Sequence, residues 1–178
     1  MNLSTKDLVY AALFVALTAA MASISIPLPG GIPLTLQPFA VNFAGFILGP
    51  KLGALSMVVY VILGALGVPV FAGGAGGFNT VLGPTGGFIW SFPLMAYVSG
   101  IWAKSKIGMA FFGVALGTMI GFAAGVFQLM LYLNSTLVVA IANGFLPFII
   151  PTFVRIVSVP VIGKLINTSL EKNGIKLA

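Results

Sequence analysis

Long apolar segments alternate with short stretches rich in glycine, proline or lysine along the whole chain. A helix needs about 20 apolar residues to cross the hydrocarbon core of a bilayer. The pattern predicts an all-α integral membrane protein, with one transmembrane domain over residues 1–178. Six transmembrane helices are expected, at about residues 8–26, 34–48, 52–66, 84–103, 108–131 and 147–170. The first segment could also be a signal peptide, but equally apolar sequence follows it, which favours a span.

One connection between these segments is unusually rich in glycine. Residues 73–87 hold seven of the 23 glycines, two threonines, one asparagine and no charge. Glycine lets the backbone approach a ligand closely, and irregular backbone inside a membrane persists only where protein buries it or where it lines a cavity. This glycine loop is therefore either a tight packed turn or the floor of a binding pocket, and its polar side chains favour the pocket. The candidate ligand-binding residues here are Gly74, Gly76, Gly77, Phe78, Asn79, Pro84, Thr85, Gly86 and Gly87.

Composition and charge refine this picture. The chain is 60% hydrophobic and 6% charged, whereas soluble domains carry about 25% charged residues, so a soluble globule is excluded. Basic residues occur singly, which does not predict nucleic-acid binding. Cytoplasmic loops are enriched in lysine and arginine, and all seven lysines fall on one side of a six-span arrangement. Both termini are therefore expected in the cytoplasm and the glycine loop outside; the lysines are Lys6, Lys51, Lys104, Lys106, Lys164, Lys172 and Lys176.

Arg155 breaks this charge pattern. It is the only arginine, and it follows Pro147 by eight residues, which places it roughly 12 Å below the outer end of the last span. A buried arginine costs about 2.5 to 3.5 kcal/mol on insertion scales. The only acids, Asp7 and Glu171, lie at the cytoplasmic ends. Arg155 therefore either reaches the outer interface or binds an anionic ligand, and we favour a carboxylate held by two hydrogen bonds.

Other side chains limit the chemistry that the chain can perform. Cysteine and histidine are absent, which excludes thiolate metal sites and a catalytic cysteine or histidine, and no metal site or cofactor is expected. The sequence has no phosphate-binding loop for ATP and no nucleophile–base pair, so an enzyme is not expected. Gln37 and Asn42 lie within the second segment, where polar side chains usually face protein or a cavity. The sequence predicts a pocket for a small, mostly apolar carboxylate, with any transport energy supplied by another protein.

Small residues recur every four positions in the first segment, at Ala12, Ala16 and Ala20. Such a stripe lets another helix come close. It could pack against a span of the same chain or dock to a partner subunit, and the spacing alone favours internal packing.

Four runs of the sequence are distinctive: residues 32–37 (IPLTLQ), 48–56 (LGPKLGALS), 60–71 (YVILGALGVPVF) and the glycine loop, with its GPTGG signature at 83–87. They resemble the BioY family, the biotin-specific substrate-binding subunits (S-components) of energy-coupling factor (ECF) transporters. The resemblance covers residues from about Ala12 to Arg155. It implies a six-helix S-component fold whose pocket opens to the outside of a bacterial cell membrane, a coupling transmembrane protein, and two ATPase subunits. It also implies that Ala12 and Ala16 belong to the face that docks the coupling protein, which reverses the preference from spacing.

The resemblance has two departures at the expected pocket. Family members often place an acidic residue and a lysine three positions apart near the start of the last helix, where this chain has Thr152 and Arg155. Some members also have a basic residue at the position of Ala75. The expected function is high-affinity biotin capture, in which Asn79 or Gln37 binds the ureido group. The alternatives are a pocket for another small carboxylate-bearing vitamin and a structural membrane subunit without a ligand.

Overall fold

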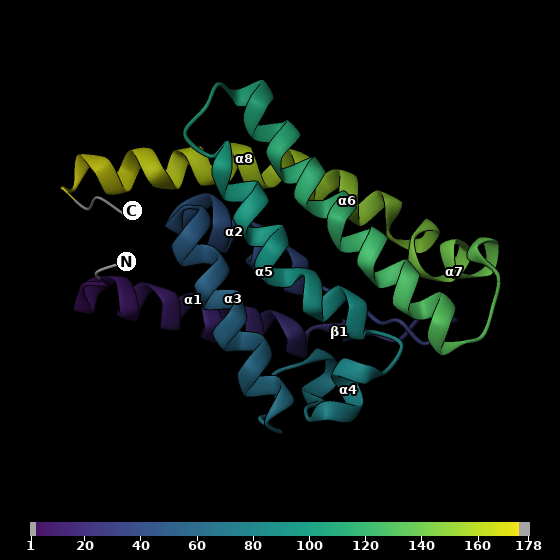
Figure 1. Cartoon of the computed structure of the whole chain (residues 1–178). Helices are drawn as coiled ribbons and strands as arrows, with labels where there is room; N and C mark the ends of the chain where they lie inside the picture. Colours follow the sequence, from purple (N-terminus) through teal and green to yellow (C-terminus); the bar gives the residue numbers. More distant parts are fainter. Residues whose placement is uncertain (1–2, 175–178) are drawn as a thin grey trace.

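The computed structural model describes residues 3–174, and the expectation for Lys176 lies outside them. The protein is mostly helical, as predicted, and each of the six predicted segments overlaps one long helix (Figure 1). These long helices are α1 (Thr5–Ser23), α2 (Gln37–Leu48), α3 (Pro50–Ala65), α5 (Gly86–Ile101), α6 (Ile107–Tyr132) and α8 (Ile149–Lys172). The shorter elements are β1 (Ser25–Ile26), β2 (Leu34–Thr35), η1 (Ala72–Gly74), α4 (Phe78–Leu82), α7 (Leu137–Gly144) and η2 (Leu146–Phe148).

Three helical segments of the described chain are long and apolar enough to cross a membrane. They cover residues 5–23, 107–132 and 137–172, the last of which joins α7 to α8. The helices α2, α3 and α5 are apolar but shorter, with 12 to 16 residues each. The lengths and composition support a membrane protein.

Local sequence explains where these helices begin and end. Ser4 caps α1, because its hydroxyl accepts from the Asp7 backbone N–H at 3.2 Å while its own backbone N–H donates to the Asp7 carboxylate at 2.9 Å. Between α2 and α3, Gly49 has φ of 82°, a conformation that favours glycine, and Pro50 starts the next helix. The chain therefore reverses direction sharply at Gly49.

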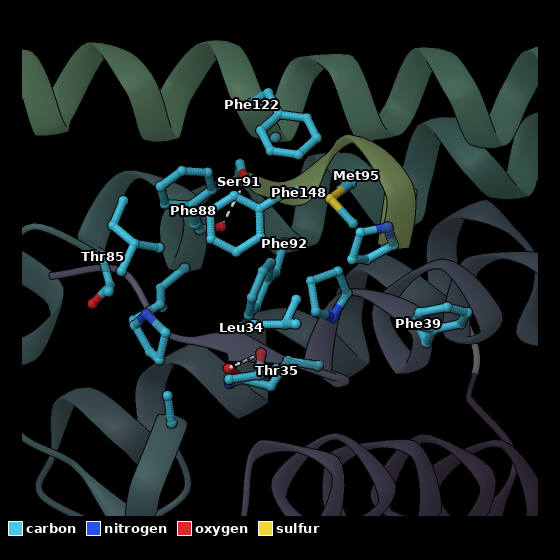
Figure 2. Close-up of a pocket in the computed structure, with 18 of the residues that line it drawn as sticks. Leu34, Thr35, Phe39, Thr85, Phe88, Ser91, Phe92, Met95, Phe122 and Phe148 are labelled. Atoms are coloured by element: carbon cyan, nitrogen blue, oxygen red, sulfur yellow. Dashed lines mark hydrogen bonds between the residues drawn. The ribbon is translucent and has the colours of Figure 1, made fainter. Parts of the chain in front are cut away.

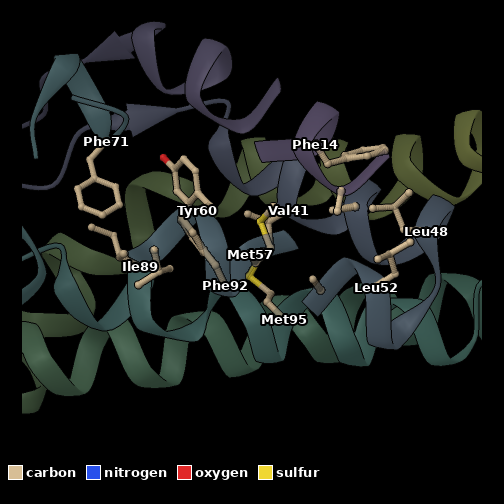
Figure 3. Close-up of a cluster of buried hydrophobic side chains, with 14 of the residues drawn as sticks. Phe14, Val41, Leu48, Leu52, Met57, Tyr60, Phe71, Ile89, Phe92 and Met95 are labelled. Carbon is tan, nitrogen blue, oxygen red and sulfur yellow. The ribbon is translucent and has the colours of Figure 1, made fainter. Parts of the chain in front are cut away.

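The core forms where α5 packs against α2 and α3, with α1 on the other side of α2 and α3 contributing Phe14 (Figure 3). Side chains from four helices fill it, including Val41, Met57, Phe92 and Met95, which are buried. At Gly117, α6 lies so close to α5 that a Cβ atom on this residue would be only 2.8 Å from the Met95 carbonyl oxygen. Gly117 therefore allows α5 and α6 to pack closely.

The connection between α1 and α2 contains a short ribbon that the sequence did not predict. Its strands β1 and β2 pair antiparallel, with Ser25 opposite Thr35 and Ile26 opposite Leu34. Ile32 is buried against Val126 and Leu129 of α6. The ribbon, α4 and α7 lie at one end of the molecule, and the two termini lie at the other end (Figure 1).

Candidate ligand-binding site

A cavity lies among α2, α5, α6 and α8, beneath the ribbon and the residues around η1 (Figure 2). Its walls are mostly apolar, with a minority of hydroxyl and amide groups and a single cation. A ligand with an apolar body and a few polar groups matches such walls. The apolar lining includes Leu34, Phe71, Phe88, Ile89, Phe92, Met95, Phe122 and Phe148, and the polar lining consists of Thr35, Gln37, Thr80, Thr85, Ser91, Thr118, Thr152 and Arg155.

Aromatic rings from three elements pack against one another along one wall. Phe122 of α6 meets Phe88 of α5 at a centroid distance of 6.2 Å and an angle of 89°, and it lies 6.4 Å from Phe148 of η2. Phe145 closes the group at 4.8 Å from Phe122. Edge-to-face pairs of this kind hold the rings in defined positions. The wall therefore offers a rigid apolar surface to a ligand.

Arg155 is the one cation of the lining, and only 6% of its surface is exposed. It lies six residues after Ile149, roughly 9 Å along α8 from the start of this helix. Within residues 3–174, no carboxylate pairs with Arg155, and its Nε is buried without a hydrogen-bond partner. Thr152, one turn earlier on the same helix, is also buried and lines the same cavity. A buried guanidinium without a counter-ion is costly, so this arrangement favours an anionic ligand.

Gln37 lies in the cavity wall, and its amide already has protein partners. The Gln37 Nε2 donates to the Tyr60 hydroxyl at 2.5 Å, and the Thr35 hydroxyl donates to Gln37 Oε1 at 3.0 Å. Tyr60 in turn donates to the Val70 carbonyl oxygen at 2.6 Å. This chain of bonds ties α2 to α3 and to the segment before η1. Contact between Gln37 and a ligand stays a prediction.

Asn42 forms a second buried network, which joins three helices. The Ser99 hydroxyl of α5 donates to Asn42 Oδ1 at 2.9 Å, and Asn42 Nδ2 donates to the Thr118 hydroxyl of α6 at 3.3 Å. All three side chains are almost completely buried. Of the three, Thr118 lines the cavity.

The glycine loop contributes to the cavity through other residues than its glycines. Its lining residues are Ala75, Thr80 and Thr85, of which only Thr85 belongs to the predicted set. The other predicted positions are absent from the lining, and Phe78 and Asn79 are exposed. Their contact with a ligand remains a prediction; these positions are Gly74, Gly76, Gly77, Phe78, Asn79, Pro84, Gly86 and Gly87.

Gly86 has a packing role in the structure. A Cβ atom at this position would overlap the Val81 carbonyl oxygen and the Gln128 amide. The Gln128 Nε2 donates to the carbonyl oxygens of Val81 at 3.2 Å and Gly83 at 2.8 Å, which fastens the loop to α6. The glycine at 86 therefore makes room for this attachment.

The small-residue stripe of α1 faces away from the rest of the chain. Ala12, Ala16 and Ala20 are exposed, whereas α1 buries Ala11, Phe14, Thr18 and Ala22 on its other side. In the part of the chain that the structure describes, no other helix covers the stripe. Internal packing, which the spacing alone favoured, is therefore wrong.

Sequence reasoning did not find most of the wall. Phe88, Phe92, Met95 and Phe122 lie inside long apolar helices, where nothing in the pattern separates a cavity-facing residue from a lipid-facing one. Thr118 carried a usable signal, because it is one of the few hydroxyl residues within the apolar run of α6.

Comparison with known proteins agrees with this arrangement. The model of the BioY family matches residues 1–172. The chain belongs to the BioY family. Among curated members, it is 41% identical over 162 residues to a probable biotin transporter BioY of Pyrococcus horikoshii, a match covering 91% of this chain and 96% of that protein. It is 44% identical over 147 residues to the biotin transporter BioY of Thermotoga maritima, covering 81% and 85%.

The fold of this BioY-family chain also matches a solved structure. The match is to the crystal structure of the S-component for biotin from an ECF-type ABC transporter, with a TM-score of 0.84 and 26% identity. It covers 92% of this chain and 91% of the other. The helices around the cavity therefore have the arrangement of a known S-component.

Proposed function

We propose that this protein is the biotin-binding S-component of an ECF-type ABC importer, which captures biotin for delivery by an ATPase module. Its relatives are biotin transporters and the matching structure is an S-component for biotin, which supports biotin as the ligand. The observation that carries the proposal is Arg155, a buried cation without a partner in the described chain, in the wall of an apolar cavity.

Biotin has chemical groups that match both the apolar and the polar parts of the cavity wall. Its sulfur-containing ring and valeryl chain are apolar and match the phenylalanine-lined surface. Its carboxylate can accept two parallel hydrogen bonds from the Arg155 guanidinium. Thr152, beside Arg155, offers a hydroxyl but no carboxylate, so we assign the ureido group to neutral partners such as Gln37 and Asn79.

The orientation in the membrane follows from charge. The described lysines lie in α1, at the start of α3, in the turn between α5 and α6 and in α8, toward the end of the molecule that holds both termini (Figure 1). This distribution and the positive-inside rule support our proposal that both termini lie in the cytoplasm, that the chain has six spans and that the cavity opens to the outside. The short helices α2, α3 and α5 would cross with the help of their flanking loops.

The partners follow from what the chain lacks and what it exposes. The sequence has no phosphate-binding loop, so ATP hydrolysis would come from two partner ATPases. The exposed stripe at Ala12, Ala16 and Ala20 would take a helix of the coupling transmembrane protein, since small residues let helices come close.

Isothermal titration calorimetry on the purified protein in detergent tests the proposal. Biotin should bind, and a vitamin without a carboxylate, such as thiamine, should not. Binding of a different carboxylate-bearing vitamin in place of biotin would support the first alternative. A protein that binds none of a vitamin panel would support a structural subunit.

A further inference from the structure

We propose that Thr118 is a second hydrogen-bond donor to the ligand group that Arg155 holds, and that Ser99 and Asn42 fix the direction of that bond. The inference rests on the proposed function, because it assigns a partner to the same ligand.

The network has a defined direction. The Ser99 hydroxyl gives its hydrogen to Asn42 Oδ1 at 2.9 Å, so the other end of the amide, Nδ2, faces Thr118 at 3.3 Å. An amide N–H can only donate, and a threonine hydroxyl accepts through its oxygen and donates one hydrogen. Thr118 therefore accepts from Asn42, and its own hydrogen is still to be placed.

Two other buried or half-buried threonines place this hydrogen on a backbone carbonyl four residues earlier. Thr18 donates to the Phe14 carbonyl oxygen at 2.7 Å, and Thr80 donates to the Gly76 carbonyl oxygen at 3.1 Å. No equivalent bond from Thr118 exists within the described residues. Its hydroxyl hydrogen is thus left to point toward the cavity that Thr118 lines.

The position of Thr118 would let this hydrogen bond to a ligand that Arg155 holds. Thr118 on α6 and Arg155 on α8 line one cavity, and α6 and α8 pack against each other. Both residues are more than nine-tenths buried, so an unpaired donor at either one is costly. A ligand oxygen bound by the guanidinium would also satisfy the hydroxyl. Arg155 supplies the charge, and Thr118 supplies a neutral donor from the neighbouring helix α6.

The test compares biotin affinity in variants at Thr118. Thr118→Val keeps the shape and removes the hydroxyl, and it should weaken binding about tenfold, because the charged ligand group loses one hydrogen bond. Thr118→Ser keeps the donor and should bind within about twofold of wild type. The matched control is Thr18→Val, which also removes a buried threonine hydroxyl but lies on α1 outside the cavity lining. It should leave the affinity unchanged.

A double variant shows whether both residues act on one ligand group. In an Arg155→Ala background, the loss caused by Thr118→Val should shrink to less than about threefold, because Arg155 no longer holds the ligand group beside Thr118. If Thr118→Val does not fold, Thr118→Cys decides instead, because a thiol is a weak donor and should bind several-fold more weakly than wild type.

Each failure has its own meaning. Wild-type protein that does not bind biotin overturns the proposed function and this inference with it. Wild-type binding that Thr118→Val leaves unchanged overturns the inference alone. An equal tenfold loss in both backgrounds would show that Thr118 acts on a different part of the ligand, which also overturns the proposal.

Discussion

Two cations on α8, nine residues apart, have opposite surroundings. Lys164 is half-buried, and its ammonium donates to the Ser105 carbonyl oxygen at 2.5 Å, in the turn between α5 and α6. Arg155 is almost fully buried, and no described residue accepts a hydrogen bond from its Nε or pairs with its charge. Lys164 bonds two segments at the end of the molecule that holds the termini, whereas the Nε of Arg155 in the cavity wall has no hydrogen-bond partner among the described residues. We therefore expect Lys164 to stabilise the fold and Arg155 to bind the proposed ligand.

The largest effect is expected far from both cations, on assembly. If ligand binding belongs to the cavity alone, Ala16→Leu on the exposed stripe of α1 should abolish association with the coupling protein and leave biotin affinity unchanged. Co-purification and calorimetry measure the two properties. The control is Ala123→Leu, which enlarges an exposed alanine on α6 and should affect neither. Loss of both properties in Ala16→Leu would break the separation between cavity and docking face.

The next largest effect tests the cavity side of the comparison. Arg155→Ala should weaken biotin binding by roughly ten- to a hundredfold, because a hydrogen bond to a charged group contributes about 1.5–3 kcal/mol and each 1.4 kcal/mol is a factor of ten. The unliganded variant should be no less stable than wild type, since an unpaired buried cation is removed. Calorimetry gives the affinity and thermal unfolding gives the stability. An Arg155→Ala protein that unfolds more easily and binds normally would make Arg155 a structural cation.

A third prediction divides the glycine loop into packed and open positions. Gly86→Ala should lower the free energy of unfolding by about 2 kcal/mol, because its Cβ would overlap the Val81 carbonyl oxygen and Gln128. Gly74→Ala should cost about 1 kcal/mol, since it meets no atom within 4 Å but has φ of +77°. Gly108→Ala, in open space at the start of α6, is the control and should not destabilise. Equal stability of Gly86→Ala and wild type would contradict the packing role.

The smallest effect concerns Lys164. Lys164→Met should lower the free energy of unfolding by about 1 kcal/mol, through the loss of its bond to the Ser105 carbonyl oxygen, and should leave biotin affinity unchanged. Lys172→Met, at an exposed lysine of the same helix, should change neither quantity. A weaker affinity in Lys164→Met would mean that the two ends of α8 are coupled.

The comparison of Arg155 with Lys164 also shows how much of the fold and the site can be predicted from the sequence. Apolar segments bounded by proline and glycine predict the long helices, because length and hydropathy alone set them. Arg155 stands out because it departs from the lysine pattern. The ribbon at residues 25–35 is difficult to predict because its prolines indicate a loop. Its position depends on the contact between Ile32 and α6.

The cavity wall is harder to predict for a physical reason. The bond between Gln37 and Tyr60 joins residues 23 positions apart, and the Asn42–Thr118 bond joins residues 76 positions apart. Such partners are set by helix packing, which local patterns do not encode. Glycine is needed where the backbone approaches a ligand closely, and it is also needed where the backbone approaches another helix closely. The sequence of the glycine loop does not distinguish these two roles. At Gly86 the role is close packing against another helix.

The central claim is that Arg155 holds the ligand carboxylate, and the most direct test is the preference for biotin over biotin amide. The amide has the same rings and chain but no negative charge. Wild type should bind the acid at least about tenfold more tightly, whereas Arg155→Ala should bind both about equally and Arg155→Lys should recover part of the preference. An Arg155→Ala protein that still prefers the acid as strongly as wild type does would show that another group binds the carboxylate.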